Sequence, residues 1–174
     1  VNFSDFLSKI DYMNDGEQIS GGKIKRAGVL FNEFYGYVCE GIYQTQEEVN
    51  NSARTSTTVT VGDLKYRDIS GPDGVPDGVI SPEYDRVPLG NSLPRFQYGG
   101  SLNASYKGID FSLAFQGIGK QNSYLSTSMV QPLRDNYGNV PAILEGKYWS
   151  PFNTTEENLA AKYPRLSNVS KSNN

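Results

Sequence analysis

Residues 96–117 read FQYGGSLNASYKGIDFSLAFQG, and polarity alternates along this stretch with great regularity. From Phe96 to Tyr106 every second residue is apolar or small, and the residues between them are mostly polar. After Lys107-Gly108 the alternation resumes, with apolar residues at Ile109, Phe111, Leu113 and Phe115. A period of two on both sides of a two-residue turn predicts a β-hairpin.

The length of the hairpin leaves two interpretations open. Strands of soluble proteins are most often about 5–6 residues long, whereas a membrane-spanning β-strand needs about 9–11 residues. The segment from Phe96 to Tyr106 fits the second length, and aromatic residues lie near its ends, as at membrane interfaces. A long hairpin in a soluble sandwich would show the same alternation, because its apolar face would then be core.

The rest of the chain has weaker patterns. Thr45, followed three residues later by Glu48, predicts a capped helical turn. Residues 62–95 are dense in Asp, Gly and Pro and predict a long structured loop. From Gly119 onwards the chain reads mostly as loop, with a short helix expected after Pro141.

Composition excludes several classes of protein. The chain of 174 residues has 16 basic and 19 acidic residues, a net charge of −3. It contains no long basic run, so we expect no nucleic-acid partner. It has no His, which removes His-dependent catalysis and His-dependent metal sites, and Cys39 is the only cysteine. No run approaches the about 18 consecutive apolar residues of a membrane-spanning helix.

An acidic loop is the candidate metal site. Asp and Gly at short spacing supply the oxygen ligands and sharp turns that Ca²⁺ prefers. The predicted ligands are Asp68, Asp73, Asp77 and Asp85. The spacing matches a calcium loop only in part, and the alternative is a turn-rich loop whose Asp side chains cap backbone N–H groups.

Catalysis is not expected. Glycoside hydrolysis needs a positioned pair of carboxylates. Carboxylates that could form such a pair are Asp68, Asp85, Asp110 and Glu145, but 19 acidic residues always offer some pair. Neither a nucleophile nor an acid/base pair stands out, so we predict that the chain is not an enzyme.

Several sequence motifs resemble motifs in the C-terminal part of the SusC/RagA family of TonB-dependent outer-membrane transporters. The run from Phe34 to Glu48 is similar to the family's FYGY…GIFQTQEE element, and Gly62 to Asp68 is similar to its GDLKYKD segment. A further similar motif consists of Asp77–Ile80, Asp85-Arg86 and Gly90–Pro94 in that order. The remaining similar motifs are the hairpin from Tyr98 to Gly117, Tyr148–Pro151 and Tyr163–Leu166.

The resemblance implies an all-β fold in which antiparallel strands form part of a large transmembrane β-barrel with long extracellular loops. Residues 1–95 would be a segment rich in extracellular loops with few strands, 96–117 a barrel hairpin, and 118–174 a long loop segment truncated before the last barrel strands. The apolar face of the hairpin would face lipid. The residues expected to face the lumen are Gln97, Ser101, Asn103, Ser105, Ser112 and Gln116.

The function that the resemblance implies is import across the outer membrane of a Gram-negative bacterium. The ligand would be a glycan, a peptide or another oligomeric nutrient. Expected partners are a SusD-like surface lipoprotein, TonB through an N-terminal part that this chain lacks, and membrane lipid. The alternative from the residues alone is a soluble secreted β module that binds calcium and carbohydrate.

Overall fold

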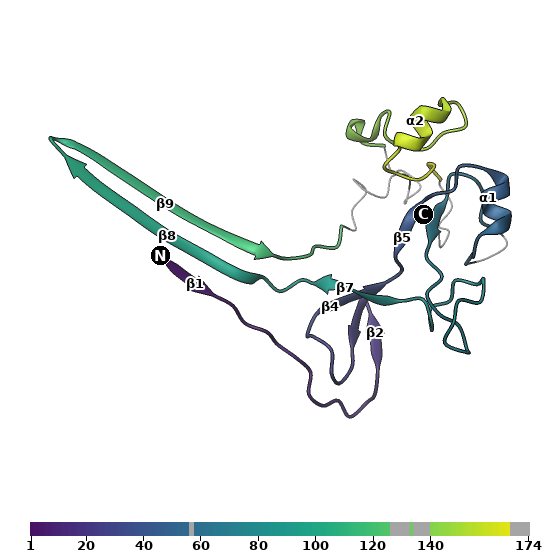
Figure 1. Ribbon diagram of the computed structural model, residues 1–174, viewed down its shortest axis with the longest axis horizontal. Coiled ribbons are helices and arrows are strands. Elements are labelled where there is room, and N and C mark those ends of the chain that lie inside the picture. Colours follow the sequence, from purple (N-terminus) through teal and green to yellow (C-terminus); the bar gives the residue numbers. More distant parts are fainter. Residues whose placement is uncertain (56–57, 126–132, 134–139, 168–174) are drawn as a thin grey trace. The chain divides into compact units, whose positions relative to one another are not determined.

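The structure is a computed structural model that describes residues 1–55, 58–125, 133 and 140–167. Antiparallel strands dominate, and the helices are short (Figure 1). The chain divides into two compact units, each of which combines two separate stretches of sequence. Unit 1 is Val1–Gly36 with Pro88–Tyr124, and unit 2 is Tyr37–Val87 with Leu125–Asn174.

The largest element of unit 1 is the predicted hairpin. Strands β8 (Arg95–Tyr106) and β9 (Ile109–Lys120) each contain 12 residues and pair antiparallel along their whole length (Figure 1). The turn residues Lys107 and Gly108 have φ values of 48° and 83°. Two consecutive positive φ values are typical of the type I′ turn, whose twist matches that of a two-stranded ribbon.

A third strand pairs with the start of the hairpin. Strand β1 (Asn2–Ser4) lies antiparallel to β8, with Phe3 opposite Tyr98, and completes a sheet in the order β1-β8-β9. An ion pair between Asp5 and Arg95 joins the end of β1 to the first residue of β8. Beyond Gly99, β8 has β9 alone as its partner among the described residues.

Unit 1 also contains a four-stranded sheet of short strands, in the order β2-β3-β4-β7. Its strands are β2 (Gln18–Ser20), β3 (Lys23–Lys25), β4 (Glu33–Gly36) and β7 (Val87–Asn91). The turn between β2 and β3 is Gly21-Gly22, where both residues have positive φ. Ile24 on β3 is fully buried.

Unit 2 is built around a strand pair and a helix. Strands β5 (Cys39–Ile42) and β6 (Leu64–Tyr66) pair antiparallel, and α1 (Gln46–Asn51) follows β5 directly. Tyr43, Val49 and Val59 form its small buried core. The remaining elements are η1 (Ala142–Leu144) and α2 (Thr155–Ala160).

The predicted all-β antiparallel fold is confirmed. The hairpin turn and the Thr45 cap are also where the sequence indicated, since the Thr45 side chain accepts a hydrogen bond from Glu48 N. Residues 1–27, which lack a clear period, nevertheless form three short strands. The expected helix after Pro141 is a single 3₁₀ turn. Within the described residues, no helix combines the length and apolarity needed to span a membrane.

Candidate functional site

The hairpin presents one continuous apolar face. In the observed register Leu102 lies opposite Leu113, Ala104 opposite Phe111, and Tyr106 opposite Ile109. Because opposite residues of an antiparallel pair share a face, the apolar residues of β8 and β9 gather on one side. The paired rows of this face are Tyr98/Gly117, Gly100/Phe115, Leu102/Leu113, Ala104/Phe111 and Tyr106/Ile109. Phe96 lies next to Gly119 at the end of the face.

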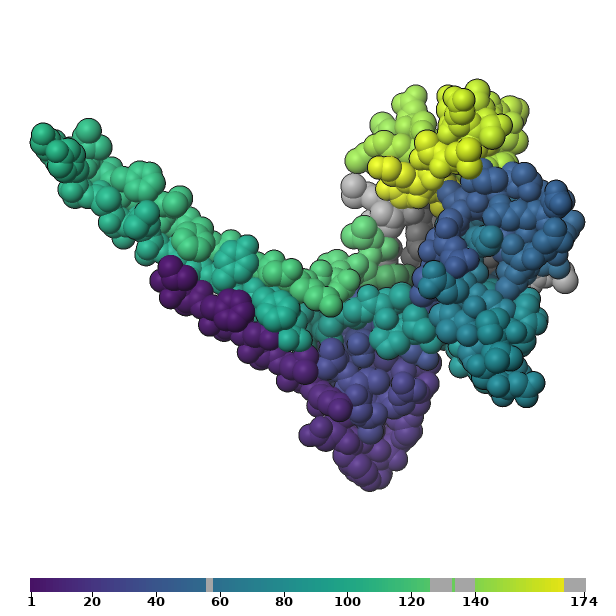
Figure 2. All heavy atoms as spheres, viewed as in Figure 1, coloured from purple at the N-terminus to yellow at the C-terminus, as the bar shows by residue number. Residues whose placement is uncertain are grey.

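This apolar face is exposed. The exposed fractions of its large side chains run from 41% for Phe96 to 74% for Ile109. Figure 2 shows β8 and β9 as a narrow ribbon that β1 accompanies over only part of its length. A contiguous row of exposed aromatic and aliphatic side chains marks a surface for lipid or for another apolar partner.

Glycines on this face are covered by aromatic rings from the opposite strand. A Cβ atom at Gly117 would lie 2.4 Å from the Tyr98 ring, and one at Gly100 would lie 2.8 Å from the Phe115 ring. At Gly119 it would lie 3.0 Å from Phe96 Cβ. The aromatic side chains therefore fill the space that the glycines leave, as in known cross-strand pairs.

The other face of the hairpin is polar. Ser112 Oγ donates a hydrogen bond to Asn103 Oδ1 at 2.7 Å, and Ser105 Oγ donates one to Asp110 Oδ1 at 2.5 Å. Strand alternation places all six residues predicted to face a lumen on this side of the sheet. Most polar and apolar side chains of the two strands are therefore on opposite faces, with Ile118, opposite Gln97, as the one large apolar side chain on the polar face of the hairpin.

The acidic loop is organised by Asp85. This residue is 0% exposed. Its Oδ1 accepts hydrogen bonds from Ile69 N at 2.7 Å and Ser70 N at 3.2 Å, and its Oδ2 accepts one from Ser81 N at 2.7 Å. Burial alone raises the pKa of the Asp85 carboxyl, but these backbone N–H groups outweigh burial and hold the pKa below its ordinary value.

Two other predicted ligands also hold the loop together. Asp68 Oδ2 accepts a hydrogen bond from Gly78 N at 2.6 Å, and Asp77 Oδ1 accepts one from Val79 N at 2.9 Å. A Cβ at Gly71 would lie 2.8 Å from Asp77 Cβ, which explains the glycine there. These contacts are those of the alternative interpretation, in which Asp side chains cap loop N–H groups.

The positions of the four aspartates are relevant to the predicted calcium site, but they do not test it. Asp68 Oδ1 is buried and accepts no hydrogen bond, so one carboxylate oxygen of the loop stays available. Within the residues that the structure describes, no group of three or more His, Cys, Asp or Glu side chains is placed to hold a metal ion. Calcium binding by Asp68, Asp73, Asp77 and Asp85 stays a prediction.

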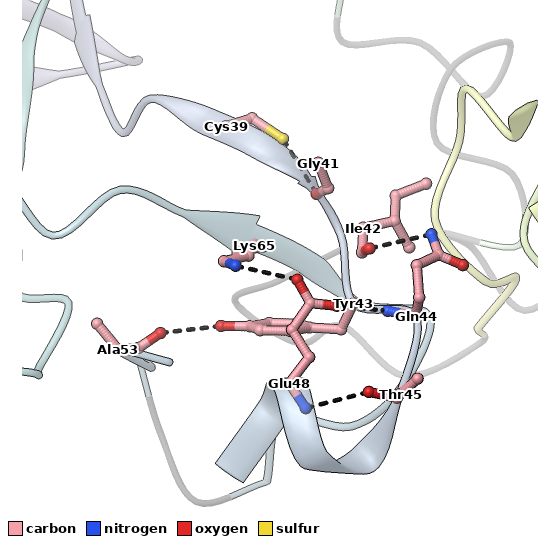
Figure 3. Close-up of polar contacts among 9 residues, drawn as sticks. All are labelled: Cys39, Gly41, Ile42, Tyr43, Gln44, Thr45, Glu48, Ala53 and Lys65. Carbon is pink, nitrogen blue, oxygen red and sulfur yellow. Dashed lines mark hydrogen bonds and ion pairs between the residues drawn. The ribbon is translucent and has the colours of Figure 1, made fainter. Parts of the chain in front are cut away.

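In unit 2, polar contacts around Tyr43 join strand β5, helix α1 and strand β6 (Figure 3). Tyr43 Oη donates a hydrogen bond to Ala53 O at 2.9 Å, and Lys65 forms an ion pair with Glu48 at 3.0 Å. Glu48 Oε2 accepts a hydrogen bond from Gln44 N at 2.9 Å, so the carboxylate caps the helix start one residue before Thr45. The hydrogen bond from Gln44 N lowers the pKa of Glu48, and Lys65 lowers it further.

Sequence reasoning missed how distant segments of unit 2 meet. Arg165 Nε donates a hydrogen bond to Asp63 Oδ1 at 2.7 Å, and Asp63 is 1% exposed. Trp149 packs on Gly62, where a Cβ would lie 2.4 Å from its ring. Three of the motifs that resemble the SusC/RagA family thus contact one another in the fold. No local sequence pattern indicates these contacts.

The all-β fold and the hairpin, which has one polar and one apolar face, place the chain in the class of all-β segments whose strands are long enough for the wall of a β-barrel. The chain is 34% identical over 149 residues to the TonB-dependent receptor P26 of Formosa agariphila. The match covers 85% of this chain and 14% of the receptor. No family model matches the chain.

This similarity supports the prediction that the chain is a segment of a TonB-dependent receptor. The SusC/RagA subtype stays a prediction. The relative is named as a receptor, in agreement with the prediction that the chain is not an enzyme. The chain spans about one seventh of the length of this relative, since the match covers 14% of it.

Proposed function

We propose that the chain is a segment of a TonB-dependent importer in the outer membrane of a Gram-negative bacterium. The hairpin of β8 and β9 would form two neighbouring strands of the barrel wall. The apolar face would contact lipid, and the polar face would line the lumen. The observation that carries this proposal is the exposed apolar face along two paired strands of 12 residues.

Strand length supports the assignment. At about 3.3 Å per residue, the eleven steps from the first to the last of 12 residues extend about 36 Å along a strand. Tilted by about 40°, such a strand rises about 28 Å, close to the about 25 Å height of the apolar band of membrane barrels. A strand of about 5–6 residues, typical of soluble sheets, would be too short.

The finer features of the proposal follow the SusC/RagA resemblance. The two-residue turn at Lys107-Gly108 would lie on the periplasmic side, where barrel turns are short, and the acidic loop would lie outside the cell. The ligand would be a glycan or another oligomeric nutrient, TonB would supply energy through another part of the receptor, and a SusD-like lipoprotein would cover the barrel.

A pair of matched substitutions tests the lipid-facing assignment. In a complete receptor that carries this segment, Leu113→Lys introduces a charge on the apolar face, and Ser112→Lys introduces one on the polar face of the same strand. A charge in the middle of the lipid face costs about 2–4 kcal/mol, so Leu113→Lys should strongly reduce the folded fraction in lipid vesicles. Ser112→Lys should fold like the parent. Equal folding of both variants would contradict the proposal.

Transport is tested by uptake. Cells that carry the complete receptor should accumulate a labelled oligosaccharide, and cells from which the receptor gene has been deleted should not. Dissipating the proton-motive force should abolish uptake by the receptor-carrying cells. Uptake that survives both deletion and de-energisation would contradict the proposed role in import.

A further inference from the structure

Unit 1 contains a pocket at the end of the hairpin that is farthest from its turn. The pocket has a volume of about 100 Å³ and is lined by the segment after β1, by β4 and β7, and by the start of β8 and the end of β9. One buried water needs about 10–15 Å³, so a group the size of a sugar ring has room here. Pockets that enclose a drug-sized ligand measure about 300–1,000 Å³, so this one would hold a single unit of an oligomer.

Part of the pocket wall is apolar. Phe6, Leu30 and Leu93 line it from three segments of unit 1. The segments that contain Phe6 and Leu30 lie side by side, because Phe31 N donates a hydrogen bond to Ser8 O at 2.9 Å. The Phe6 side chain is 49% exposed, so core packing does not enclose it. An aromatic ring with aliphatic neighbours forms a surface on which the C–H face of a sugar can pack.

Asn122 adds an unused amide to the same pocket. Its backbone N–H donates a hydrogen bond to Asn91 O at 2.9 Å, and its side chain lies against Gly90, where a Cβ would be 2.4 Å from Asn122 Oδ1. Asn122 Oδ1 is buried and accepts no hydrogen bond from the described residues. An unpaired amide in a native structure calls for an explanation, and a ligand in the pocket supplies one.

The charges that line the pocket balance. Arg95 forms an ion pair with Asp5. Glu33 Oε2 accepts a hydrogen bond from Leu30 N at 3.3 Å, and within the described part of the chain neither Glu33 nor Lys120 forms an ion pair. One carboxylate and one ammonium therefore remain, and together they have no net charge. These two groups can accept from and donate to hydroxyl groups without favouring an anionic ligand.

The pocket opens on the polar side of the hairpin. Lys120 follows Gln116 and Ile118 at every second position of β9 and lies opposite Arg95. In the proposed barrel this face lines the lumen, and the end farthest from Lys107-Gly108 is the outer end. Small-molecule sites are frequent in the mouths of β-barrels. A ligand that enters from outside would therefore meet this pocket before the rest of the polar face.

We propose that this pocket binds one neutral sugar ring of an oligosaccharide ligand at the outer mouth of the barrel. The Phe6 ring packs against the C–H face of the sugar, and the side chains of Asn122, Glu33 and Lys120 form hydrogen bonds with its hydroxyl groups. This inference rests on the proposed function, because the pocket lies on the path of a ligand only if the polar face lines a lumen. It adds a binding site and narrows the ligand to neutral sugars.

Binding to an array tests the inference. The complete receptor, purified in detergent, is applied to an array that carries neutral oligosaccharides, oligosaccharides with uronic acids, and peptides. Phe6→Ala removes the aromatic ring from the pocket, and Asn122→Ala removes the unused amide. Phe3→Ala is the matched control, because Phe3 is 67% exposed and lies opposite Tyr98 on the apolar face.

The parent and Phe3→Ala should bind a neutral oligosaccharide with equal affinity, and Phe6→Ala and Asn122→Ala should bind it at least about tenfold more weakly. The unfolding temperature of Asn122→Ala should not fall, because Asn122 Oδ1 accepts no hydrogen bond from the described residues. Weaker binding at an unchanged unfolding temperature separates a binding role from a structural one. Parental binding by both pocket variants would overturn the inference, and so would binding of the parent to acidic sugars or peptides alone.

Uptake of the labelled oligosaccharide distinguishes this inference from the proposed function. If cells with the complete receptor import it, and cells with either pocket variant import it at the parental rate, the pocket assignment is wrong and the role in import remains. If the parent receptor neither binds anything on the array nor imports the oligosaccharide, the proposed function fails together with the pocket assignment.

Discussion

The ring of Tyr98 lies over Gly117 on the neighbouring strand, so closely that a Cβ at Gly117 would be 2.4 Å from both Cζ and Oη of the tyrosine. The two residues are directly opposite each other in the register of β8 and β9. The glycine makes room for the ring to lie against the sheet, and the ring covers backbone that the glycine would leave bare.

Gly117→Ala should therefore displace the Tyr98 ring. The far end of a side chain can move, so we expect a moderate loss of about 1 kcal/mol in the free energy of unfolding. Gly119→Ala is the control, because its Cβ would lie 3.0 Å from Phe96 Cβ and needs a smaller adjustment. Thermal unfolding in detergent measures both.

A double-mutant cycle separates the contact from the backbone effect of alanine. If the Tyr98 ring causes the loss, then Gly117→Ala should have little effect in a Tyr98→Ala background. An undiminished loss in that background would show that the ring contact does not explain the glycine.

Asp85 should be essential to the loop that precedes β7. Asp85→Ala leaves the N–H groups of Ile69, Ser70 and Ser81 without their buried acceptor, at a cost of about 1–3 kcal/mol. Limited proteolysis should cut the variant between residues 68 and 85 faster than the parent. Asp73→Ala, in the exposed part of the same loop, should be cut at the parental rate.

The loop should also loosen in acid. The pKa of Asp85 is lower in the folded chain than its ordinary value of 3.8, so its contribution to stability is present above that value. This contribution is lost as the pH falls from about 4 through the folded pKa. Asp85→Asn should remove that part of the acid dependence of unfolding, and a pH profile unchanged by the substitution would contradict the role of Asp85.

The Asp63–Arg165 ion pair should stabilise unit 2 far more than an exposed pair does. Asp63 is 1% exposed, and Arg165→Ala would leave its carboxylate buried without this cation, at a cost of about 3 kcal/mol. Arg67→Ala removes the exposed pair with Glu40 and should cost less than about 1 kcal/mol. Chemical denaturation distinguishes the two, and equal losses would contradict the structural role of the buried pair.

Calcium binding by the acidic loop makes a prediction of its own. If Asp68, Asp73, Asp77 and Asp85 bind Ca²⁺, millimolar Ca²⁺ should raise the unfolding temperature, and Asp68→Asn should abolish the rise. Mg²⁺ at the same concentration is the control, because it demands a tighter geometry. No rise with Ca²⁺ would leave the aspartates as caps of loop N–H groups.

The sequence predicted those parts of the fold that local patterns specify. Strict alternation from Phe96 to Tyr106 and from Ile109 to Phe115 located both long strands, and Lys107-Gly108 located their turn. Thr45 with Glu48 located the start of α1, because helix capping depends on residues only three positions apart.

Contacts between distant residues could not be predicted in this way. The three-residue strands β1, β2 and β3 are too short to show a period, and they form because partners elsewhere in the chain complete their hydrogen bonds. The pairing of Asp63 with Arg165 joins positions 102 residues apart. In the acidic loop, composition alone could not tell a cation ligand from a carboxylate that binds backbone N–H groups, as Asp85 does.

The solution state of the 174-residue chain tests the central claim most directly. Light scattering is measured in plain buffer and again in detergent above its critical micelle concentration. A lipid-facing hairpin predicts aggregation in buffer, because the apolar face of β8 and β9 is exposed, and a dispersed, uniform particle in detergent. A folded monomer in plain buffer, with that face covered, would contradict the account and favour a soluble binding module.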